Sequence, residues 1–513
     1  MQLRYKEFDE FIVVNKGFGF RTHRVSDGQF GLVEFLSEKL NMKLFVVQRL
    51  DKETSGLILF AKSKQAAHNI SQLFETQQVK KTYFFLTDQF SSQQELVVEA
   101  YIDKQQNSFV IIDDHLPNSK TDFKFVKQLG KYYLWQAFPE TGKPHQIRLH
   151  AQKAKIPILG DQAHGGSPFF RLALHAHKVV MTLDRSTFNL EVATPTLFLQ
   201  ESENVYEYFF RACLEKRREL YDIPTGESFR LVHAESDRVR ADIFADHLWI
   251  YDFIEVGLTE TEKKSIYAFA ATEGLNPVIR QMIDRGSGVG GLEKKTLEVV
   301  NTDEAWQAQE EKINYALKIN SGFSPGLFLD QRENRLWVRQ NSKTKKVLNL
   351  FSYTGGFSVA AGLGSAQQIT TVDVSAKFLS WSKENFELNE LKFDQHEFFA
   401  QDCLLFLKGS VKRGRKWDLI ICDPPTFGRT KESVWKIERD LPTLAQLMLE
   451  CLEKKGQILF TCNYEKMNRD EIIKMFTQKL RGFQIERLPQ MSLDYEHTDD
   501  LKNVMKGLLL TKV

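Results

Sequence analysis

An aspartate flanked by basic residues stands in a short polar segment near the start of the chain. Residues 49–56 (RLDKETSG) contain this Asp51 and precede the apolar run 57–61, a pattern that predicts a turn leading into a β-strand. Such a turn holds a carboxylate rigidly at the edge of a sheet. Residues 141–150 (TGKPHQIRLH) gather hydrogen-bond donors and the cation of Arg148. Together the two segments indicate either a site for an anionic or polar ligand or a surface cluster of ion pairs.

A glycine turn and a series of acids stand in the C-terminal part of the chain. Residues 349–357 (NLFSYTGGF) follow a predicted strand and open a predicted helix, so backbone groups of the turn can approach a ligand closely. Asp373 ends the next predicted strand, about 20 residues on, where an acid binds ribose hydroxyls in nucleotide-binding sheets. A nicotinamide-dependent dehydrogenase would show both features. Residues 423–427 (DPPTF) favour a methyltransferase instead, because such a loop after a strand is typical of methyltransferases acting on nitrogen or on nucleic-acid bases.

Short strands with few helices are expected to position the two N-terminal segments, 49–56 and 141–150. Four β-rich segments and one segment with helical spacing predict an α+β domain with a mixed or antiparallel sheet: strands 10–14, 57–61, 82–87 and 132–137, and helix 65–76. The highly charged segment 213–227 ends in Ile-Pro-Thr-Gly and predicts a linker. The first domain is therefore expected at 1–212.

The rest of the chain divides into two further patterns. Strands at 229–233 and 248–254 and a helix at 260–273 predict a small α+β middle domain over 228–322, to which we assign no chemistry. From residue 345 onward, apolar strand cores that are each followed by a helical stretch predict a doubly wound parallel sheet, the α/β Rossmann-like fold, over 323–513. The predicted strand cores are 347–351, 369–373, 419–422 and 458–461.

Composition excludes several classes of protein. The 513 residues are enough for two or three domains, and no apolar run approaches the roughly 20 residues of a membrane span. The first residues do not resemble a secretory signal, so we expect a cytoplasmic protein without membrane contact. Five cysteines without paired close spacing argue against a disulfide framework and against a metal site. A formal net charge of +2 leaves any affinity for a polyanion to local basic patches.

The two N-terminal segments resemble the RluA family of pseudouridine synthases. The family signature, Arg-Leu-Asp-x-x-Thr-Ser-Gly and a later His-Gln-x-Arg-x-His, is present in order at residues 49–56 and 145–150. The similarity runs over residues 1 to about 210. It implies the α+β pseudouridine synthase fold, isomerisation of uridine to pseudouridine, and a reaction without a cofactor.

This resemblance assigns roles to three residues. Asp51 becomes the catalytic carboxylate, Tyr83 the aromatic group against the target base, and Arg148 the cation that keeps Asp51 ionised. Gln48 and Gly17 depart from the residues that the family often carries at those positions, which leaves the choice of substrate open.

The C-terminal segments resemble class I S-adenosylmethionine-dependent methyltransferases of the RlmI and RlmK type, which modify bases of large-subunit ribosomal RNA. The similarity covers about residues 325–513 and includes residues 326–332 (GLFLDQR) ahead of the glycine turn. It implies S-adenosylmethionine as the cofactor and a wall against the target base at 423–427, with Asp423 as a catalytic residue. The cofactor contacts that it implies are Ser352, Tyr353, Thr354, Gly355, Asp373, Asp402 and Asp423.

Two features of the sequence indicate different bases as the acceptor of the methyl group. The loop that begins at Asp423 is more similar to the branch that methylates guanine nitrogen 7, a direct displacement that needs positioning rather than a nucleophile. Cys462 stands where the branch that methylates cytosine carbon 5 carries its attacking thiolate. The other interpretation of Cys462 is a buried cysteine at the end of a strand. We favour guanine, with cytosine as the alternative and Cys462 as its candidate catalytic residue.

Two active sites on one chain indicate an RNA that presents both targets, and we expect 23S ribosomal RNA or its assembly intermediate as the partner. Nothing in the sequence requires a protein partner. A basic run is either a further RNA contact or a solvated loop: Lys408, Lys412, Arg413, Arg415 and Lys416. The alternative from another class is an RNA-binding ribosome-assembly factor in which one or both domains are inactive. Intact Asp51 and an intact 423–427 loop weigh against that alternative.

Overall fold

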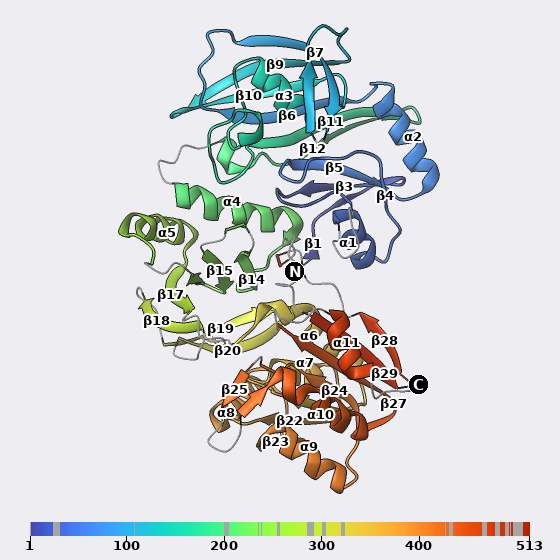
Figure 1. The fold of residues 1–513 in the computed structure, drawn as a ribbon, viewed down its shortest axis with the longest axis vertical. Helices are drawn as coiled ribbons and strands as arrows, with labels where there is room; N and C mark the ends of the chain where they lie inside the picture. Colours follow the sequence, from blue (N-terminus) through green and yellow to red (C-terminus); the bar gives the residue numbers. More distant parts are fainter. Residues whose placement is uncertain are drawn as a thin grey trace. The chain divides into compact units, whose positions relative to one another are not determined.

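The computed structural model of this chain forms two compact units (Figure 1), each described by itself below. The first unit comprises Met1–Pro224 and Thr259–Thr272, and the second comprises Thr225–Leu258 and Glu273–Val513. Within the described residues, no helix is both long and apolar enough to cross a membrane. The structure describes residues 2–23, 31–106, 108–199, 205–233, 235–236, 239–253, 257–284, 292–299, 304–319, 324–425, 427–429, 434–463, 469–477, 483–487, 492, 494–495 and 506–512.

A mixed 11-stranded sheet organises the first unit. Its strands lie in the order β2-β3-β5-β11-β6-β10-β9-β7-β8, with β12 paired to β11 and β4 paired to β5. Only the β5–β11 pair is parallel among the pairings described for this sheet. The strands are β2 (Lys6–Glu7), β3 (Phe11–Lys16), β4 (Phe45–Val46), β5 (Ser55–Ala61), β6 (Lys80–Thr87), β7 (Glu95–Gln105), β8 (Ser108–Ile112), β9 (Ser119–Leu129), β10 (Tyr132–Pro139), β11 (Leu174–Leu183) and β12 (Ser186–Glu191).

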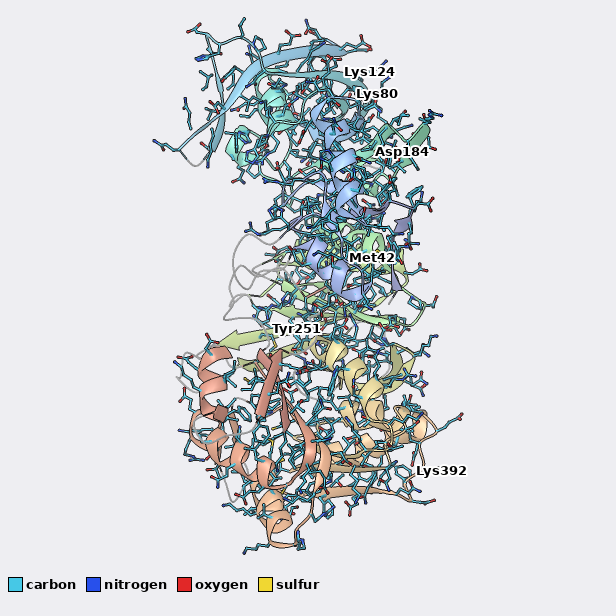
Figure 2. The ribbon with its side chains drawn as sticks, turned by 90° about the vertical axis from the view of Figure 1, so that its right-hand side faces the viewer. Met42, Lys80, Lys124, Asp184, Tyr251 and Lys392 are labelled. Carbon is cyan, nitrogen blue, oxygen red and sulfur yellow. The ribbon has the colours of Figure 1, made fainter. Side chains whose placement is uncertain are left out.

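Helices pack onto this sheet through their apolar faces. Helix α2 begins after the cap Ser63, whose hydroxyl accepts from Ala66 N, and buries Ala66 and Ile70 against strand residues. The helices of the unit are α1 (Leu32–Lys39), α2 (Lys64–Glu75), α3 (Gln146–Lys153), α4 (Val205–Leu220) and α5 (Glu260–Glu273). The charged side chains Lys124 and Asp184 stay exposed (Figure 2), as expected for a core that is built from the apolar positions.

Helix α4 occupies much of the segment that was expected to be a linker. Residues up to Leu220 are helical, and strand β13 (Tyr221–Asp222) then pairs with β1 (Gln2–Leu3). The helix buries apolar side chains, and Phe210 meets Phe269 of α5 at 5.4 Å between ring centroids. The charge pattern of 213–227 indicates a solvated segment, but Lys216 and Arg217 are themselves only 1% exposed, so charge does not mark an exposed face here. The two units divide at Pro224, and the boundaries given above for the domains stay a prediction.

The second unit begins with a five-stranded sheet in the order β14-β15-β16-β17-β18, followed by the hairpin β19-β20. All its strand pairs are antiparallel except β16–β17, which the helix α5 connects. The strands are β14 (Ser228–Val232), β15 (Val239–Phe244), β16 (His247–Asp252), β17 (Asn276–Asp284), β18 (Leu292–Val299), β19 (Ala305–Glu310) and β20 (Ile313–Lys318). The glycine-rich turn at 286–291 lies outside the described residues.

A seven-stranded sheet in the order β23-β22-β21-β24-β27-β29-β28 forms the rest of the second unit. Strands β23 to β27 of this order are parallel, and β29 runs antiparallel to both neighbours. The strands are β21 (Lys346–Leu350), β22 (Gln368–Asp373), β23 (His396–Ala400), β24 (Trp417–Cys422), β27 (Leu452–Cys462), β28 (Phe483–Arg487) and β29 (Lys506–Lys512), with a separate hairpin of β25 (Phe427–Arg429) and β26 (Val434–Lys436). This is the doubly wound sheet that the sequence predicts.

Two apolar clusters cover the two faces of this sheet. One joins strand residues to Phe406, Leu444 and Phe476 of α9, α10 and α11. The other joins strand residues to α6, α7 and α8, through Val338, Val359 and Phe386. The helices are α6 (Arg332–Asn341), α7 (Gly356–Leu363), α8 (Ala376–Leu388), α9 (Cys403–Lys412), α10 (Ile437–Glu450) and α11 (Arg469–Thr477). The carboxyl ends of the parallel strands therefore meet at one edge between the layers, where such sheets bind ligands.

Candidate active sites

Asp51 lies in the turn between β4 and β5, and buried polar side chains fix that turn. The hydroxyl of Thr22 donates to Leu50 O at 3.1 Å and accepts from Leu50 N at 3.3 Å. The ammonium of Lys16 is fully buried and donates at 2.9–3.1 Å to the carbonyls of Gly17, Phe20 and Lys52. Burial lowers the pKa of Lys16 to about 7 although Glu53 and Asp51 oppose the shift. The side chains of Thr22 and Lys16 thus anchor the turn that carries the carboxylate by binding its backbone groups.

A close approach of two strands brings Asp51 toward Tyr83. Gly56, at φ +116°, pairs with Ala176 of β11, and a Cβ there would lie 2.2 Å from Ala176 O. Ala176 in turn pairs with Tyr83 of β6. Only glycine allows β5 to run this close to β11. Burial, and after it the charge of Asp51, raises the pKa of the Tyr83 hydroxyl above its ordinary value.

Arg148, in the first turn of α3, joins two carboxylates. Its Nη1 donates to Asp51 Oδ2 at 3.2 Å, and its Nε and Nη2 each donate to Asp161 at 2.7 Å. Burial opposes the positive charge, but the hydrogen bonds and charges of Asp161 and Asp51 outweigh it and raise the pKa of Arg148. The structure thus brings Arg148 into contact with Asp51 and places Tyr83 within reach of the charge of Asp51, while the roles of the three residues stay a prediction. A carboxylate that accepts a hydrogen bond from a permanent cation is held in place to act at a ribose.

Two histidines complete the surroundings of Asp51. His145 Nε2 lies 4.0 Å from Asp51 Oδ2, and His145 Nδ1 lies 3.2 Å from Nε2 of His164. The sequence showed His145 within its motif, but nothing in the pattern singled out His164. It reaches the site because the 3-10 turn Gln162–His164 directly follows Asp161.

At the carboxyl end of β22, Asp373 is fastened by backbone donors. Its Oδ2 accepts from Tyr353 N at 2.9 Å and its Oδ1 from Ser375 N at 2.8 Å. Burial raises the pKa of Asp373, and these backbone hydrogen bonds oppose the shift. The remaining lone pairs of the carboxylate can accept from ribose hydroxyls. This places Asp373 and the glycine turn side by side, as the sequence predicts.

The glycine turn between β21 and α7 is shaped for a ligand. Gly355 has φ +80°, and a Cβ there would lie 1.9 Å from Ser382 Oγ. Thr354 Oγ1 donates to Gly326 O at 2.5 Å, which ties the turn to the preceding loop. The hydroxyl of Ser352 is buried without a hydrogen-bond partner in the described structure. A cradle that only glycine fits and an orphaned hydroxyl suit a polar cofactor such as S-adenosylmethionine.

Two exposed apolar residues, which the sequence motifs did not single out, lie close to Asp373 and Asp402 in the sequence. Val374, next to Asp373, is 54% exposed, and Leu405, after Asp402, is 51% exposed. Asp402 itself caps α9, with its Oδ1 accepting from Leu405 N at 3.1 Å. Exposed apolar side chains beside polar groups provide contact for a flat ring such as adenine. In the sequence, the apolar residues that come shortly after Asp373 and Asp402 are the signal from which these contacts could have been predicted.

Asp423 stands at the carboxyl end of β24 among polar side chains. Its Oδ1 accepts from Thr461 Oγ1 at 2.7 Å and its Oδ2 from Gln331 Nε2 at 3.0 Å. Burial raises the pKa of Asp423 to about 7, against the bonds from Thr461 and Gln331. Asn334 fixes the amide of Gln331 by donating to its Oε1 at 2.7 Å. Gln331 belongs to the 326–332 segment, and its contact with Asp423 was not predicted.

The rest of the 423–427 loop and Cys462 do not share the polar surroundings of Asp423. Pro425 O accepts from Trp435 Nε1 at 2.7 Å, whereas Thr426 and the side chain of Phe427 lie outside the described residues. Cys462 ends β27 and is fully buried in the apolar cluster that α9, α10 and α11 cover. A side chain packed in an apolar cluster is shielded from a base bound at the sheet edge.

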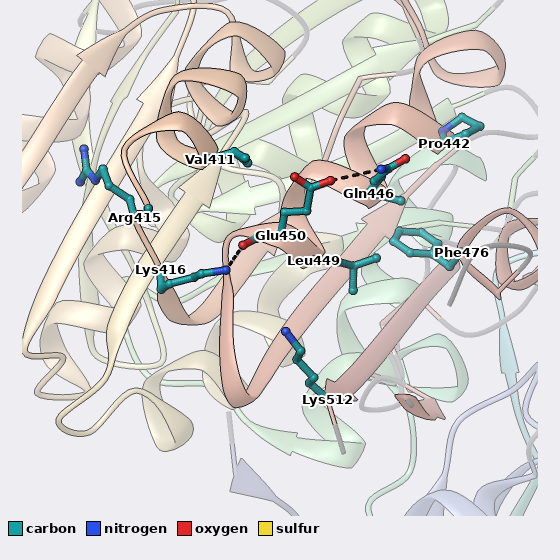
Figure 3. A pocket seen from close by; sticks show the side chains of 11 residues that line it. Val411, Arg415, Lys416, Pro442, Gln446, Leu449, Glu450, Phe476 and Lys512 are labelled. Atoms are coloured by element: carbon teal, nitrogen blue, oxygen red, sulfur yellow. Dashed lines mark hydrogen bonds between the residues drawn. The ribbon is translucent and has the colours of Figure 1, made fainter. Parts of the chain in front are cut away.

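A cavity of about 570 Å³ lies beside the seven-stranded sheet. Figure 3 shows that Leu449, Phe476 and Lys512 line it, and that Lys416 donates to the carbonyl of Glu450. It lies at the amino end of β27, the edge opposite to Asp373 and Asp423. Arg415 of the same basic run pairs with Glu397. Two cations of the run thus have partners within the domain, and RNA contact by this run stays a prediction.

Comparison with known proteins matches two parts of the chain to two families. Residues 10–153 match the family described as RNA pseudouridylate synthase, and residues 259–494 match the family described as S-adenosylmethionine-dependent methyltransferase. The ribosomal RNA large subunit methyltransferase K/L of Shewanella sp. (strain ANA-3) is 33% identical over 295 residues, which are 54% of this chain and 40% of that protein. That of strain MR-4 is 33% identical over 291 residues, 54% of this chain and 38% of that protein. The chain thus spans about two fifths of the length of these relatives.

Solved structures share the fold of the C-terminal part. A crystal structure of the methyltransferase SMU.776 in complex with S-adenosylhomocysteine has a TM-score of 0.53 and 22% identity, and covers 66% of this chain and 88% of that one. An S-adenosylmethionine-dependent methyltransferase from Streptococcus mutans has a TM-score of 0.53 and 21% identity, with the same coverage. The chain carries a pseudouridine synthase domain followed by an S-adenosylmethionine-dependent methyltransferase domain.

Proposed function

We propose that this chain is a bifunctional RNA-modification enzyme. Its N-terminal domain, of the RluA type, isomerises uridine to pseudouridine at Asp51, and its C-terminal domain, of the RlmK type, methylates guanine nitrogen 7 beside Asp423. The substrate is 23S ribosomal RNA. The observation that carries the first activity is the contact of Arg148 with Asp51 at 3.2 Å, in a turn whose Leu50 and Lys52 backbone groups are hydrogen-bonded by the side chains of Thr22 and Lys16.

In the isomerisation, the carboxylate of Asp51 assists departure of the uracil, either by attacking the ribose or by taking a proton from it. Arg148 donates to that carboxylate, and Asp161 keeps Arg148 in place. The half-buried ring of Tyr83 offers a face for the base after it leaves its helix. The chain's own residues suffice for this reaction, which changes bonds but no oxidation state.

In the methylation, the C-terminal domain positions two ligands. S-adenosylmethionine supplies the methyl group when bound at the glycine turn, where Ser352, Tyr353, Thr354, Gly355, Asp373 and Asp402 would hold it. The ionised carboxylate of Asp423 can accept from the N1–H and the amino group of guanine. Guanine nitrogen 7 has its own lone pair, so transfer needs alignment and no protein nucleophile.

Burial of Cys462 favours guanine over cytosine. Methylation of cytosine carbon 5 requires a thiolate that adds to the ring before the transfer. Cys462 is 0% exposed within an apolar cluster, where a structural cysteine is inert as a nucleophile. The large-subunit ribosomal RNA substrate is supported by the relatives, whose names state it.

Nucleoside-resolved mass spectrometry tests this proposal. Ribosomal and transfer RNA are compared from cells that carry the gene, lack it, or carry Asp51→Asn or Asp423→Asn. We expect one pseudouridine to disappear with Asp51→Asn and one 7-methylguanosine with Asp423→Asn, both from 23S ribosomal RNA. If loss of the gene changes no nucleoside, a non-catalytic role in ribosome assembly replaces the proposal. If 5-methylcytidine disappears instead, the acceptor is cytosine.

A further inference from the structure

His145 is held in a special backbone conformation directly beside Asp51. It precedes α3 with φ 57° and ψ 14°, a left-handed conformation that few residues other than glycine adopt. Its side chain is 33% exposed, and its Nε2 lies 4.0 Å from Asp51 Oδ2. Phe109 of β8 lies near the ring, with 6.0 Å between centroids. The imidazole is therefore placed with one nitrogen toward the candidate site.

The other nitrogen of His145 is tied to a second histidine. Nδ1 lies 3.2 Å from His164 Nε2, and the two rings meet edge to face. Burial lowers the pKa of both histidines, Arg148 lowers them further, and Asp51 and Asp161 oppose the shift. The pair is thus neutral at neutral pH. When Nδ1–H of His145 donates to His164, Nε2 of His145 carries a lone pair that can accept a proton.

Isomerisation of uridine needs such a proton acceptor. The bond from ribose C1′ to uracil N1 breaks, a bond from C1′ to C5 forms, and C5 still carries its hydrogen. A base then removes this proton. The electron pair of the C5–H bond restores the C5–C6 double bond, the N1–C6 π pair moves to N1, and N1 takes up one proton. The step balances without an oxidant, a reductant or a cofactor.

We propose that His145 is this base, with Nε2 removing the proton from C5 and His164 sharing the resulting charge through Nδ1. The inference rests on the proposed pseudouridine synthase activity. Asp51 works at the ribose and Arg148 is permanently charged. The hydroxyl of Tyr83 keeps its proton, because burial and Asp51 both disfavour its ionisation. A neutral imidazole offers a lone pair at neutral pH that these groups do not.

Two RNA substrates separate proton removal from the earlier bond changes. 23S ribosomal RNA is transcribed in vitro with uridine or with 5-fluorouridine, whose fluorine cannot leave as a proton. Single-turnover rates are measured for the wild type, His145→Gln and the matched control His68→Gln, an exposed histidine of α2. We expect His145→Gln to slow pseudouridine formation about 100-fold or more while rearrangement of 5-fluorouridine stays within about threefold of wild type.

The 5-fluorouridine reaction also reports whether the variant is folded. Equal slowing on both RNAs, or slowing on neither, would overturn the role of His145 in proton removal. Deuterium at C5 gives an independent measurement, since it should slow His145→Gln more than the wild type, and equal isotope effects contradict the inference. A wild-type chain that is inactive on both RNAs would instead overturn the proposed synthase activity, and this inference with it.

Discussion

Arg148 binds Asp161 through two parallel hydrogen bonds of 2.7 Å, from Nε to Oδ2 and from Nη2 to Oδ1. The side chain of Asp161 is 1% exposed, so this bidentate pair lies in the interior. The remaining nitrogen, Nη1, is left to donate to Asp51. Asp161 therefore sets the orientation of the cation that donates to Asp51.

We expect Asp161→Asn to lower pseudouridine formation about 100-fold, because a guanidinium that loses its bidentate partner shifts away from Asp51. The measurement is the single-turnover rate on 23S ribosomal RNA, with methylation by the same chain as an internal reference. Asp184→Asn serves as the control, since Asp184 is exposed in the turn between β11 and β12 (Figure 2). An Asp161→Asn variant as active as this control would show that Arg148 needs no such partner.

Gly355→Ala should abolish binding of S-adenosylmethionine. Alanine at φ +80° is strained, and its Cβ would lie 1.9 Å from Ser382 Oγ and 2.7 Å from Ser382 Cβ. We expect a loss of about 3 kcal/mol or more in the free energy of unfolding of the second unit. Gly414→Ala is the matched control, because Gly414 has φ +68° and a Cβ added there would meet nothing within 4 Å. That variant should lose only about 1 kcal/mol.

Isothermal titration with S-adenosylmethionine and thermal unfolding check this pair of variants. Similar losses in both would mean that backbone strain, rather than the collision with Ser382, decides the effect. Undiminished cofactor binding by Gly355→Ala would remove the glycine turn from the cofactor site.

Both candidate sites could be predicted from the sequence because their motifs are continuous. Asp51 and Arg148 each stand in a run of characteristic residues, and the apolar strand cores before Asp373 and Asp423 predict a shared sheet edge. The parallel sheet was predictable for the same reason, since each strand is a short apolar run followed by a helix.

Partners that come from distant segments were not predictable. Gln331 lies 92 positions before Asp423, and only the packing of the 326–332 segment against the strand ends brings them to 3.0 Å. His164 shows no motif of its own. The helical character of the 213–220 segment was also missed, because tertiary burial of α4 outweighs its charge pattern.

Cys462→Ser should keep methylation if guanine is the acceptor. The substitution removes a thiol that the proposed displacement does not use, and the buried hydroxyl should lower the free energy of unfolding by about 1–3 kcal/mol. The measurement is methyl transfer to 23S ribosomal RNA at a temperature below unfolding. Cys451→Ser, another fully buried cysteine of the same cluster, controls for the stability loss. Loss of methyl transfer by Cys462→Ser alone, with cofactor binding retained, would establish the cytosine branch.

Methyl transfer should increase as the pH rises through about 7. Burial raises the pKa of Asp423 from 3.8 to about 7, so the carboxylate that accepts from guanine is protonated at lower pH. The free energy of unfolding changes in the opposite direction as the pH rises. Because the folded-state pKa is the higher one, the contribution of this group to stability is fully present below pH 3.8 and is lost as the pH rises through about 7.

Rates of methyl transfer between pH 5.5 and 8.5, roughly one and a half pH units to either side of that pKa, measure this dependence. Asp423→Asn should lower the rate and remove the rise near pH 7, since an amide does not titrate in this range. Asp418→Asn is the matched control on the same strand: Asp418 lies at the other end of β24, where it accepts from Lys346 N. A rise near pH 7 that persists in Asp423→Asn would assign the titration to another group and leave Asp423 without a role in holding the base.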